Sequence, residues 1–251
     1  MSAPTANADT VALVVPCCNE QERLNLAQIE VLTADAGVTV VLVDDGSTDA
    51  TLSILRGIAA GRSGNDVEVV ALEHNAGKGE AVRAGMRAAL RSNPAWIGYL
   101  DADFSTPASE MLRLINVARS SDTCNAVLGS RVAMLGRRIT RTRFRHYTGR
   151  VFATAASNVL GLAVYDTQCG AKLFRSGDAL NCALAEPFRS PWAFDVELLG
   201  RLIRYGFAAE TFREEPLEIW KDRPGSKRSV GSSLHATATL WSIRRDIRRA
   251  T

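Results

Sequence analysis

Two aspartates, Asp101 and Asp103, stand one residue apart directly after the apolar run 96–100. A run of that composition predicts a buried strand, and open α/β sheets bind ligands beyond the carboxyl ends of their strands. Carboxylate oxygens in such a position suit Mg²⁺ or Mn²⁺, which proteins hold with one or two carboxylates together with substrate phosphates. The pair therefore indicates a metal site, the alternative being that it only caps the following helix.

A second acidic pair, Asp44 and Asp45, follows the β-branched run 38–43. Any one of the polar residues at 47–49 is enough to cap the next helix, so capping does not account for the pair. A carboxylate at the end of a strand can accept hydrogen bonds from a ribose or a base. The pattern favours a nucleotide near these two residues.

The turn Gly77-Lys78-Gly79 comes between a predicted strand at 67–72 and a helix. Backbone N–H groups at a helix start attract anions, and a lysine adds a positive charge there. The turn is not a Walker motif, and no Gly-x-Gly-x-x-Gly follows the first strand at 11–15, which weakens a dinucleotide interpretation. The alternative is a pair of loop glycines with a surface lysine.

These motifs lie in a regular alternation of strand and helix patterns, which predicts an α/β fold with a mostly parallel central sheet flanked by helices. The expected strands are 11–15, 38–43, 67–72, 96–100 and 126–128, and the expected helices are 20–36, 50–60, 80–91, 107–120 and 145–160. At 251 residues, one domain over residues 11–230 is the expectation. We expect residues 1–10 to be flexible and residues 231–251 to form a C-terminal basic amphipathic helix.

The composition is that of a protein with an ordinary hydrophobic core. Hydrophobic residues make up 46% of the chain, and no run approaches the roughly 18 apolar residues of a spanning helix. Residues 1–10 lack the basic start and the apolar core of a secretory signal. The 5 cysteines have neither the even count nor the paired spacing of a disulfide framework or a zinc site. The pattern favours a reducing cytoplasm.

The net charge of +3 conceals an asymmetry between the two halves of the chain. Residues 1–130 carry 9 Lys and Arg against 16 Asp and Glu, whereas residues 131–251 carry 21 against 11. An acidic half suits a metal ion, and a basic half can face phosphate, anionic lipid or nucleic acid. Between residues 131 and 150, arginines are frequent, and their forked side chains match phosphate oxygens, although a solvated surface run is the alternative.

Two segments have the pattern of amphipathic helices. Residues 145–160 carry an apolar stripe, which is more often a core-facing surface than a shallow membrane face. Residues 233–249 combine an apolar side and Trp241 with clustered arginines, which is typical of a helix that lies on anionic lipid. Nucleic acid is the competing partner, but no recognisable nucleic-acid module is present. We therefore expect no nucleic-acid binding and a peripheral attachment to an anionic, cytoplasmic membrane surface.

Taken in order, these motifs resemble the family-2 glycosyltransferases of the GT-A fold, with matching segments at 15–20, 44–49, 75–79, 101–103 and 129–131. Three later segments are similar to the polyprenyl-phosphate hexosyltransferase branch, which includes the glucosyl- and mannosyltransferases acting on dolichyl phosphate: 166–174, 192–199 and 225–227. The resemblance covers about residues 11–230. It implies inverting, metal-dependent transfer of a hexose from a nucleotide sugar to a polyprenyl or dolichyl phosphate. Glucose from UDP-glucose is favoured over mannose from GDP-mannose.

On the donor side, the resemblance implies that Asp103 binds the Mg²⁺ or Mn²⁺ ion with the diphosphate and that Asp101 supports nucleotide and metal. Ser105 stands where mannose synthases often have a glutamine as another metal ligand. Either Ser105 coordinates weakly, or water and the sugar diphosphate complete the shell. The residues that would line the nucleotide pocket or close over the diphosphate are Pro16, Glu20, Asp45, Lys78, Arg223 and Lys227.

On the acceptor side, Arg131 and Arg145 match arginine positions of the branch and are expected to contact the acceptor phosphate. A lipid monophosphate needs no general base, because a phosphate monoester with a second pKa of roughly 6 is ionised at neutral pH. A hydroxyl acceptor would need a base, and Asp195 is then the candidate, unless it is a buried structural carboxylate. A catalytically silent scaffold is a third possibility, against which the intact Asp-Ala-Asp and Gly-Lys-Gly motifs count.

Overall fold

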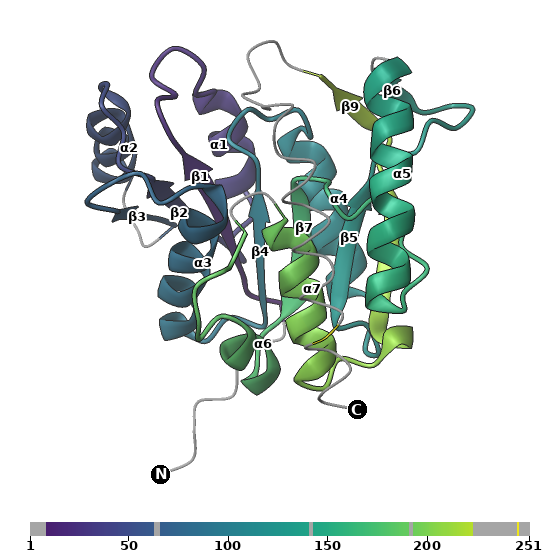
Figure 1. Ribbon diagram of the computed structural model, residues 1–251. Coiled ribbons are helices and arrows are strands. Elements are labelled where there is room, and N and C mark those ends of the chain that lie inside the picture. The colour runs from purple at the N-terminus through teal and green to yellow at the C-terminus, as the bar shows by residue number, and fades with distance from the viewer. Residues whose placement is uncertain (1–8, 63–65, 141–142, 191–192, 223–244, 246–251) are drawn as a thin grey trace.

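The computed structural model describes residues 9–62, 66–140, 143–190, 193–222 and 245, and these form an α/β fold with helices on both faces of a central sheet (Figure 1). Within this part of the chain, the sheet has seven strands in the order β3-β2-β1-β4-β7-β5-β8. Their bounds are β1 (Val11–Cys17), β2 (Val38–Asp44), β3 (Val67–Ala71), β4 (Trp96–Leu100), β5 (Ala126–Ser130), β7 (Ala171–Arg175) and β8 (Phe212–Pro216). The predicted fold class is confirmed.

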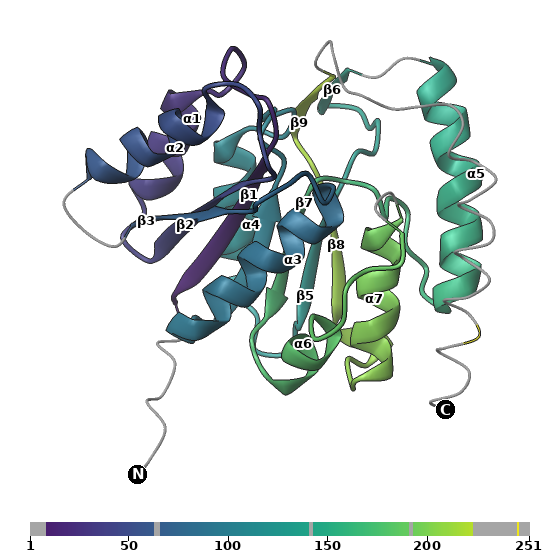
Figure 2. The ribbon, with the colours of Figure 1, turned by 60° about the vertical axis from the view of Figure 1, so that its left-hand side comes forward.

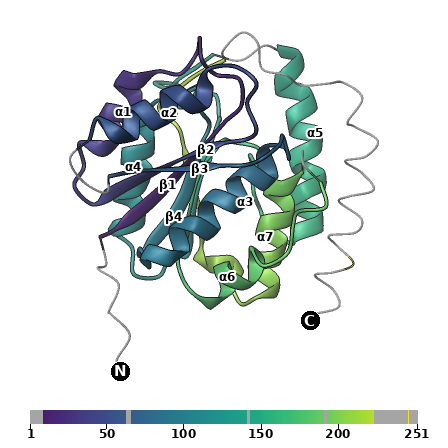
Figure 3. The ribbon, with the colours of Figure 1, turned by 90° about the vertical axis from the view of Figure 1, so that its left-hand side faces the viewer.

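Seven α-helices lie in the described part of the chain: α1 (Leu26–Thr33), α2 (Thr51–Ala60), α3 (Lys78–Ala89), α4 (Ala108–Arg119), α5 (Arg143–Leu160), α6 (Asp178–Ala183) and α7 (Phe194–Arg204). Helices α1, α2 and α4 cover one face of the sheet, and α3, α6 and α7 cover the other, with α5 beside α7 (Figures 2 and 3). Two 3-10 turns, Leu90–Ser92 and Ala209–Thr211, accompany them.

Side chains alternate along the strands and so build two hydrophobic layers. In β1, Leu13 and Val15 pack with α1 and α4, whereas Val14 packs on the opposite side with α3 and α7. Helix α5 faces this second layer through Ala156 and Leu160, whereas Val151, in the apolar stripe of its sequence, is 74% exposed, so the core-facing interpretation of that stripe holds only in part. Among the described residues, no helix combines the length and the apolar character needed to cross a membrane.

Strand β7 departs from the parallel arrangement, because it runs antiparallel between β4 and β5. Leu100, the last residue of β4, is opposite Ala171, the first residue of β7. The residues that precede β7 therefore lie at the carboxyl edge of the sheet, beside the acidic turn that follows β4. The sequence predicts a mostly parallel sheet, but β7 was not among the expected strands, so its position and direction were not predicted.

The first helix begins later than its sequence pattern suggests, so the predicted range 20–36 is wrong at its start. Asn25 is the N-cap of α1, and its side chain accepts a hydrogen bond from the Gln28 amide. Upstream, Asn19 has a φ of 54°, and the Glu20 amide donates to the Thr51 hydroxyl oxygen at 2.8 Å. This leaves Glu20 in a loop at the end of β1 rather than in a helix.

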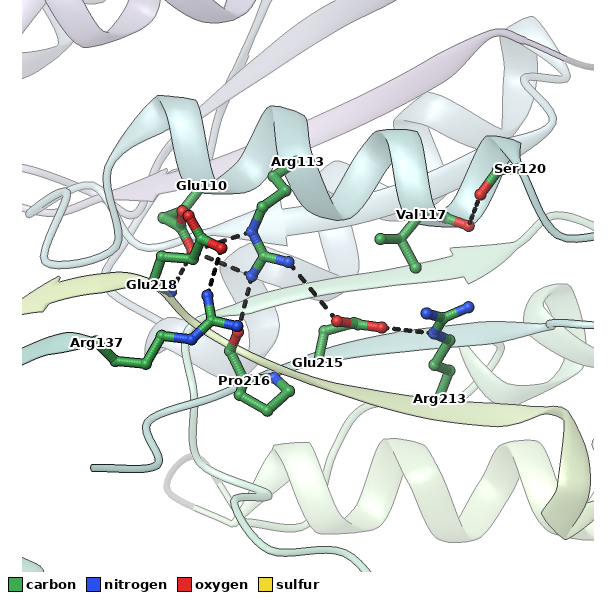
Figure 4. Close-up of polar contacts among 9 residues, drawn as sticks. All are labelled: Glu110, Arg113, Val117, Ser120, Arg137, Arg213, Glu215, Pro216 and Glu218. Carbon is green, nitrogen blue, oxygen red and sulfur yellow. Dashed lines mark hydrogen bonds and ion pairs between the residues drawn. The ribbon is translucent and has the colours of Figure 1, made fainter. Parts of the chain in front are cut away.

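A small second sheet joins two distant segments, β6 (Arg138–Thr140) and β9 (Ile219–Lys221), in parallel. A charged network fastens this ribbon to α4 (Figure 4). Glu110, only 4% exposed, accepts the Glu218 amide at 2.7 Å and pairs with Arg113. The Arg113 guanidinium also donates to the Pro216 carbonyl at 2.9 Å. Together these bonds fix the chain where it leaves β8 for the ribbon.

Replacing Glu110 with alanine should lower the free energy of unfolding by about 2–3 kcal/mol, because the Glu218 amide and the Arg113 guanidinium lose a buried acceptor. Arg213→Ala is the matched control, since its side chain belongs to the same network but is 52% exposed. It should cost less than about 1 kcal/mol. Urea denaturation of the two variants measures both losses, and equal losses would show that burial does not determine the strength of this network.

Candidate active site

Four predicted site residues lie at the carboxyl edge of the sheet. Pro16 is the penultimate residue of β1, Asp45 follows β2, Asp101 follows β4 and Arg131 follows β5. These four strands share one direction, so their ends meet at one edge, where open α/β sheets place their ligands. Motifs that are far apart in the sequence thus lie together at the carboxyl edge of the sheet.

The Asp45 carboxylate organises the loop that leads into α3. It is buried and accepts hydrogen bonds from the amides of Ala76, at 2.8 Å, and Gly77, at 3.0 Å. Gly46 permits this contact, because its φ is 59° and a Cβ there would lie 2.4 Å from the Asn75 nitrogen. The carboxylate therefore fixes the approach to Lys78, while contact with a nucleotide stays a prediction for Asp45.

Lys78, the first residue of α3, forms an ion pair with the acidic turn. Its Nζ lies 2.5 Å from Asp101 Oδ1, and 5.9 Å and 5.7 Å from the ring centroids of Tyr99 and Phe194. Desolvation disfavours the ammonium, although the side chain is still 40% exposed, but attraction to Asp101, Asp195 and Asp103 outweighs it and holds the pKa of Lys78 above its ordinary value. A charged lysine is thus in contact with the acidic turn, and a diphosphate bound there would be attracted to its positive charge.

The turn that holds Asp103 is sharply bent and tied to the ribbon. Phe104 has a φ of 48°, and the Ser105 amide donates to Asp103 Oδ1 at 2.8 Å. The Ser105 carbonyl in turn accepts the Lys221 amide of β9 at 3.0 Å. These bonds fix the direction of the Asp103 carboxylate.

The donor set at this turn fits a hard divalent ion bound in part by its substrate. Asp101 and Asp103 supply carboxylate oxygens, the ligands that Mg²⁺ and Mn²⁺ prefer. Nowhere in the described residues do three or more His, Cys, Asp or Glu side chains come together as a metal cluster. Such an ion would therefore take further oxygens from a diphosphate or from water.

Glu20 lies between the end of β1 and the start of α2. Its carboxylate pairs with Arg23 at 2.8 Å, and the neighbouring Asn19 amide donates to the Ser47 hydroxyl at 3.0 Å. The loop after β1 and the turn after β2 are thus bonded to each other. A shared nucleotide pocket stays a prediction for Glu20 and Asp45.

Arg131 has a partner that was not predicted. Its Nε and Nη2 donate to the two oxygens of Asp166 at 2.6 and 2.7 Å, and its guanidinium lies 5.5 Å from the Trp220 ring centroid. Burial opposes the charge, but attraction to Asp166 is stronger and raises the pKa of Arg131. Contact with an acceptor phosphate stays a prediction for Arg131, and it would use Nη1 or require this pair to open.

Asp195 is 5% exposed and belongs to a buried polar group. Its Oδ1 accepts hydrogen bonds from the Tyr99 hydroxyl and from Lys172 Nζ, the latter at 2.7 Å. Burial and the nearby Asp195 charge hold the pKa of Tyr99 well above its ordinary value, so the phenol stays protonated. Asp195 Oδ1 is therefore engaged within the protein, and a role as base would fall to Oδ2.

Some predicted site residues lie outside what the structure describes. These are Arg223 and Lys227, the side chain of Arg145, and the C-terminal segment 231–251 apart from Arg245.

Two residues at the site were missed by the sequence reasoning, Lys172 and Asp166. Both lie in the segment 166–174, for which the sequence suggested a resemblance but no role. The available signal was a lysine inside the otherwise apolar strand Ala171–Arg175, since a charge at such a position must find a partner.

The combination of this fold and this site defines a class of protein. In a mostly parallel α/β sheet, the Asp-Ala-Asp turn after β4 and Lys78 at the start of α3 bring together the motifs by which the sequence resembles the GT-A glycosyltransferases.

The comparisons with known proteins agree. The family model described as Glycosyl transferase family 2 matches residues 12–179, so the chain belongs to glycosyltransferase family 2. A dolichyl-phosphate beta-glucosyltransferase of Drosophila melanogaster is 32% identical over 241 residues, covering 86% of this chain and 68% of that protein. A polyprenol monophosphomannose synthase of Mycolicibacterium smegmatis is 26% identical over 241 residues, covering 95% and 89%.

A solved structure also shares the fold. Glucosyl-3-phosphoglycerate synthase from Mycobacterium tuberculosis, in complex with Mn²⁺, UDP and glucosyl-3-phosphoglycerate, matches with a TM-score of 0.67 at 22% identity. The match covers 94% of this chain and 80% of that one.

Asp166→Asn should destabilise the protein by about 3 kcal/mol, because it leaves the buried Arg131 charge without its counter-ion. The control is Asp35→Asn, which breaks a pair with Arg119 whose side chains are 28% and 16% exposed. That change should cost only about 1 kcal/mol. Chemical denaturation gives both values. A loss at Asp166 no greater than the loss at Asp35 would mean that Arg131 can turn to solvent.

Proposed function

We propose that this glycosyltransferase moves a hexose, with glucose from UDP-glucose favoured, onto a polyprenyl or dolichyl phosphate, with inversion at the anomeric carbon. The observation that carries the proposal is the Lys78–Asp101 pair beside Asp103 at the carboxyl edge of the sheet. The names of two relatives, a dolichyl-phosphate beta-glucosyltransferase and a polyprenol monophosphomannose synthase, support the class of acceptor.

The donor would bind through its diphosphate. Asp103 and Asp101 would hold a Mg²⁺ or Mn²⁺ ion, which, when bound, neutralises charge on the leaving diphosphate. Lys78 adds a fixed positive charge on the same side, and preorganised charges of this kind stabilise the departing group. Pro16, Glu20 and Asp45 border the nucleotide, and Arg223 and Lys227 would close over the diphosphate.

The acceptor would attack the anomeric carbon in line with the leaving diphosphate, and a single displacement of this kind inverts the sugar. A phosphate monoester is ionised at neutral pH, so it needs positioning but no base. The two hydrogen bonds that Tyr99 and Lys172 donate to Asp195 Oδ1 support a structural role for Asp195, and an ionised phosphate acceptor is compatible with that role because it needs no base. Arg131 and Arg145 are the candidates for the phosphate.

A hydroxyl acceptor, in another lipid or in a soluble molecule, is the second candidate. It would require Asp195 as the base, because an alcohol must lose a proton as it attacks. A strict requirement for the Asp195 carboxylate in an enzyme that still folds would favour it. GDP-mannose is the competing donor, in line with the relative that is a mannose synthase.

We also propose that the protein acts at the cytoplasmic face of a membrane as a peripheral protein. A polyprenyl acceptor resides in lipid, and the half of the chain after residue 130 carries 21 Lys and Arg against 11 Asp and Glu. Basic surfaces of this kind are attracted to anionic lipid headgroups.

A donor screen tests the proposal directly. UDP-glucose and GDP-mannose are each supplied with Mn²⁺ or Mg²⁺, with and without a short polyprenyl phosphate, and release of the nucleoside diphosphate is followed. We expect release from UDP-glucose that depends on the lipid phosphate. Release from GDP-mannose would reassign the sugar, release indifferent to the lipid would favour a hydroxyl acceptor, and no use of either donor would contradict the proposal.

Asp103→Ala should abolish metal-dependent transfer. Loss of a residue that merely supports a metal ligand costs about 10- to 100-fold, so loss of the ligand itself should exceed that range. Asp122→Ala removes an exposed carboxylate from the turn before β5, at the other edge of the sheet, and should leave the rate unchanged. Initial rates at several Mn²⁺ concentrations provide the measurement. Retained activity in Asp103→Ala would remove the metal assignment.

A further inference from the structure

A lysine lies in the middle of the sheet with all of its hydrogen-bonding capacity used. Lys172 belongs to the inserted strand β7 and is 0% exposed. Its Nζ donates to the Tyr99 hydroxyl at 2.8 Å, to Asp195 Oδ1 at 2.7 Å and to the Cys169 carbonyl. An ammonium has three N–H donors, and here each has an acceptor. A buried charge is tolerated only when it is paired in this way.

The three acceptors belong to three different elements. Tyr99 is in β4, Asp195 is in the first turn of α7, and Cys169 is in the loop that enters β7. One ammonium therefore joins the strand that carries the acidic turn, a helix on the sheet and the loop beside that turn. The group is more than an ion pair, because one of its bonds goes to the backbone.

The carbonyl that accepts this bond precedes Gly170, and the Gly170 backbone is in contact with Asp101. The Asp101 amide donates to the Gly170 carbonyl at 2.9 Å. A Cβ at position 170 would lie 2.1 Å from the Asp101 carboxylate carbon, so the carboxylate packs directly on the Gly170 backbone. The Gly170 backbone thus sets the place of the Asp101 carboxylate, and Lys172 holds the Cys169 carbonyl of the peptide just before it.

The same group also supports the lysine of the donor site. Lys172 Nζ and Lys78 Nζ lie 5.1 and 5.9 Å from the centroid of the Tyr99 ring. A ring held by its hydroxyl presents a fixed surface to Lys78, and cations are attracted to such a surface. Lys78 and Asp101, which pair with each other, are therefore both in contact with groups that Lys172 fixes.

We propose that Lys172 is the positioning residue of the donor site, holding the Cys169–Gly170 peptide and Tyr99 so that Asp101 and Lys78 meet the diphosphate and its metal ion. Asp195 is then the counter-ion and anchor of Lys172 and not a base. The inference rests on the proposed function for the identity of the ligand, but the position of Asp101 can be measured without any ligand.

The test compares the wild type with Lys172→Met, which keeps the length of the side chain and removes the ammonium. Amide hydrogen exchange is followed by mass spectrometry on peptides that cover residues 98–104 and 167–172. We expect exchange in both peptides to become about tenfold faster, because the loop loses its anchor. Affinity for UDP in the presence of Mn²⁺ should fall about 10- to 100-fold, as it does when support of a metal ligand is lost. The apparent KM for the acceptor should change much less.

Arg119→Met is the matched control. Arg119 also joins a carboxylate, Asp35, to a backbone carbonyl, that of Asp9, with distances of 2.8 and 2.9 Å. It ends α4 at the opposite edge of the sheet. Its loss should lower stability without changing exchange at 98–104 or UDP affinity.

The double variant Lys172→Met/Asp195→Asn separates the loss of the bond to the Cys169 carbonyl from the loss of charge balance at Asp195. It also serves as the test if the single variant does not fold. Without an unpaired buried charge it should recover stability, yet UDP affinity should stay low because the Cys169 carbonyl still lacks its donor. Recovery of affinity and of slow exchange together would overturn the proposal, as would unchanged exchange at 98–104 in Lys172→Met. A wild type that binds no nucleotide would refute the proposed function, while the exchange result would still decide the role of Lys172.

Discussion

The reversal of β7 is the constraint on which the rest of the site depends. A strand inserted antiparallel between β4 and β5 starts where its neighbours end, so the segment 166–170 lies at the carboxyl edge. A parallel strand would have brought its final residues there and left Asp166 and Gly170 at the far edge. The contact between Gly170 and Asp101, and the pairing of Asp166 with Arg131, both follow from this single choice of direction.

Two buried cations are paired with carboxylates in this reversed strand, in the loop before it and in the elements beside them. Arg131 is bound by Asp166, and Lys172 by Asp195, with exposed fractions of 8% or less for all four side chains. Buried ion pairs add little net stability compared with apolar residues of the same shape, but breaking one is expensive. They are therefore better suited to keeping the loop in one conformation than to raising the free energy of unfolding. One conformation is what a site needs when it holds the carboxylates of Asp101 and Asp103 close together.

Features formed by a few neighbouring residues could be predicted from the sequence, whereas contacts between residues far apart in the chain could not. The apolar run before Asp101, the β-branched run before Asp45 and the glycines around Lys78 are each contained in a few residues, so the edge of the sheet could be assembled from them. Arg131 and Asp166 are 35 residues apart, and Lys172 and Tyr99 are 73 apart. No periodicity connects such pairs, and only the antiparallel insertion brings them together. The late start of α1 has a local cause, the cap at Asn25, which competed with an equally plausible helix start at Glu20.

The hydrogen bond between the Ser105 carbonyl and the Lys221 amide has a thermodynamic consequence. It joins the turn of Asp103 to strand β9, from which the chain continues toward the segment 223–227. Coupling between two sites is reciprocal, so a ligand that orders the turn must favour the ordered ribbon by the same free energy with which the ribbon favours that ligand. One backbone bond therefore links binding at the Asp103 turn to the stability of the ribbon, without any change in the sheet.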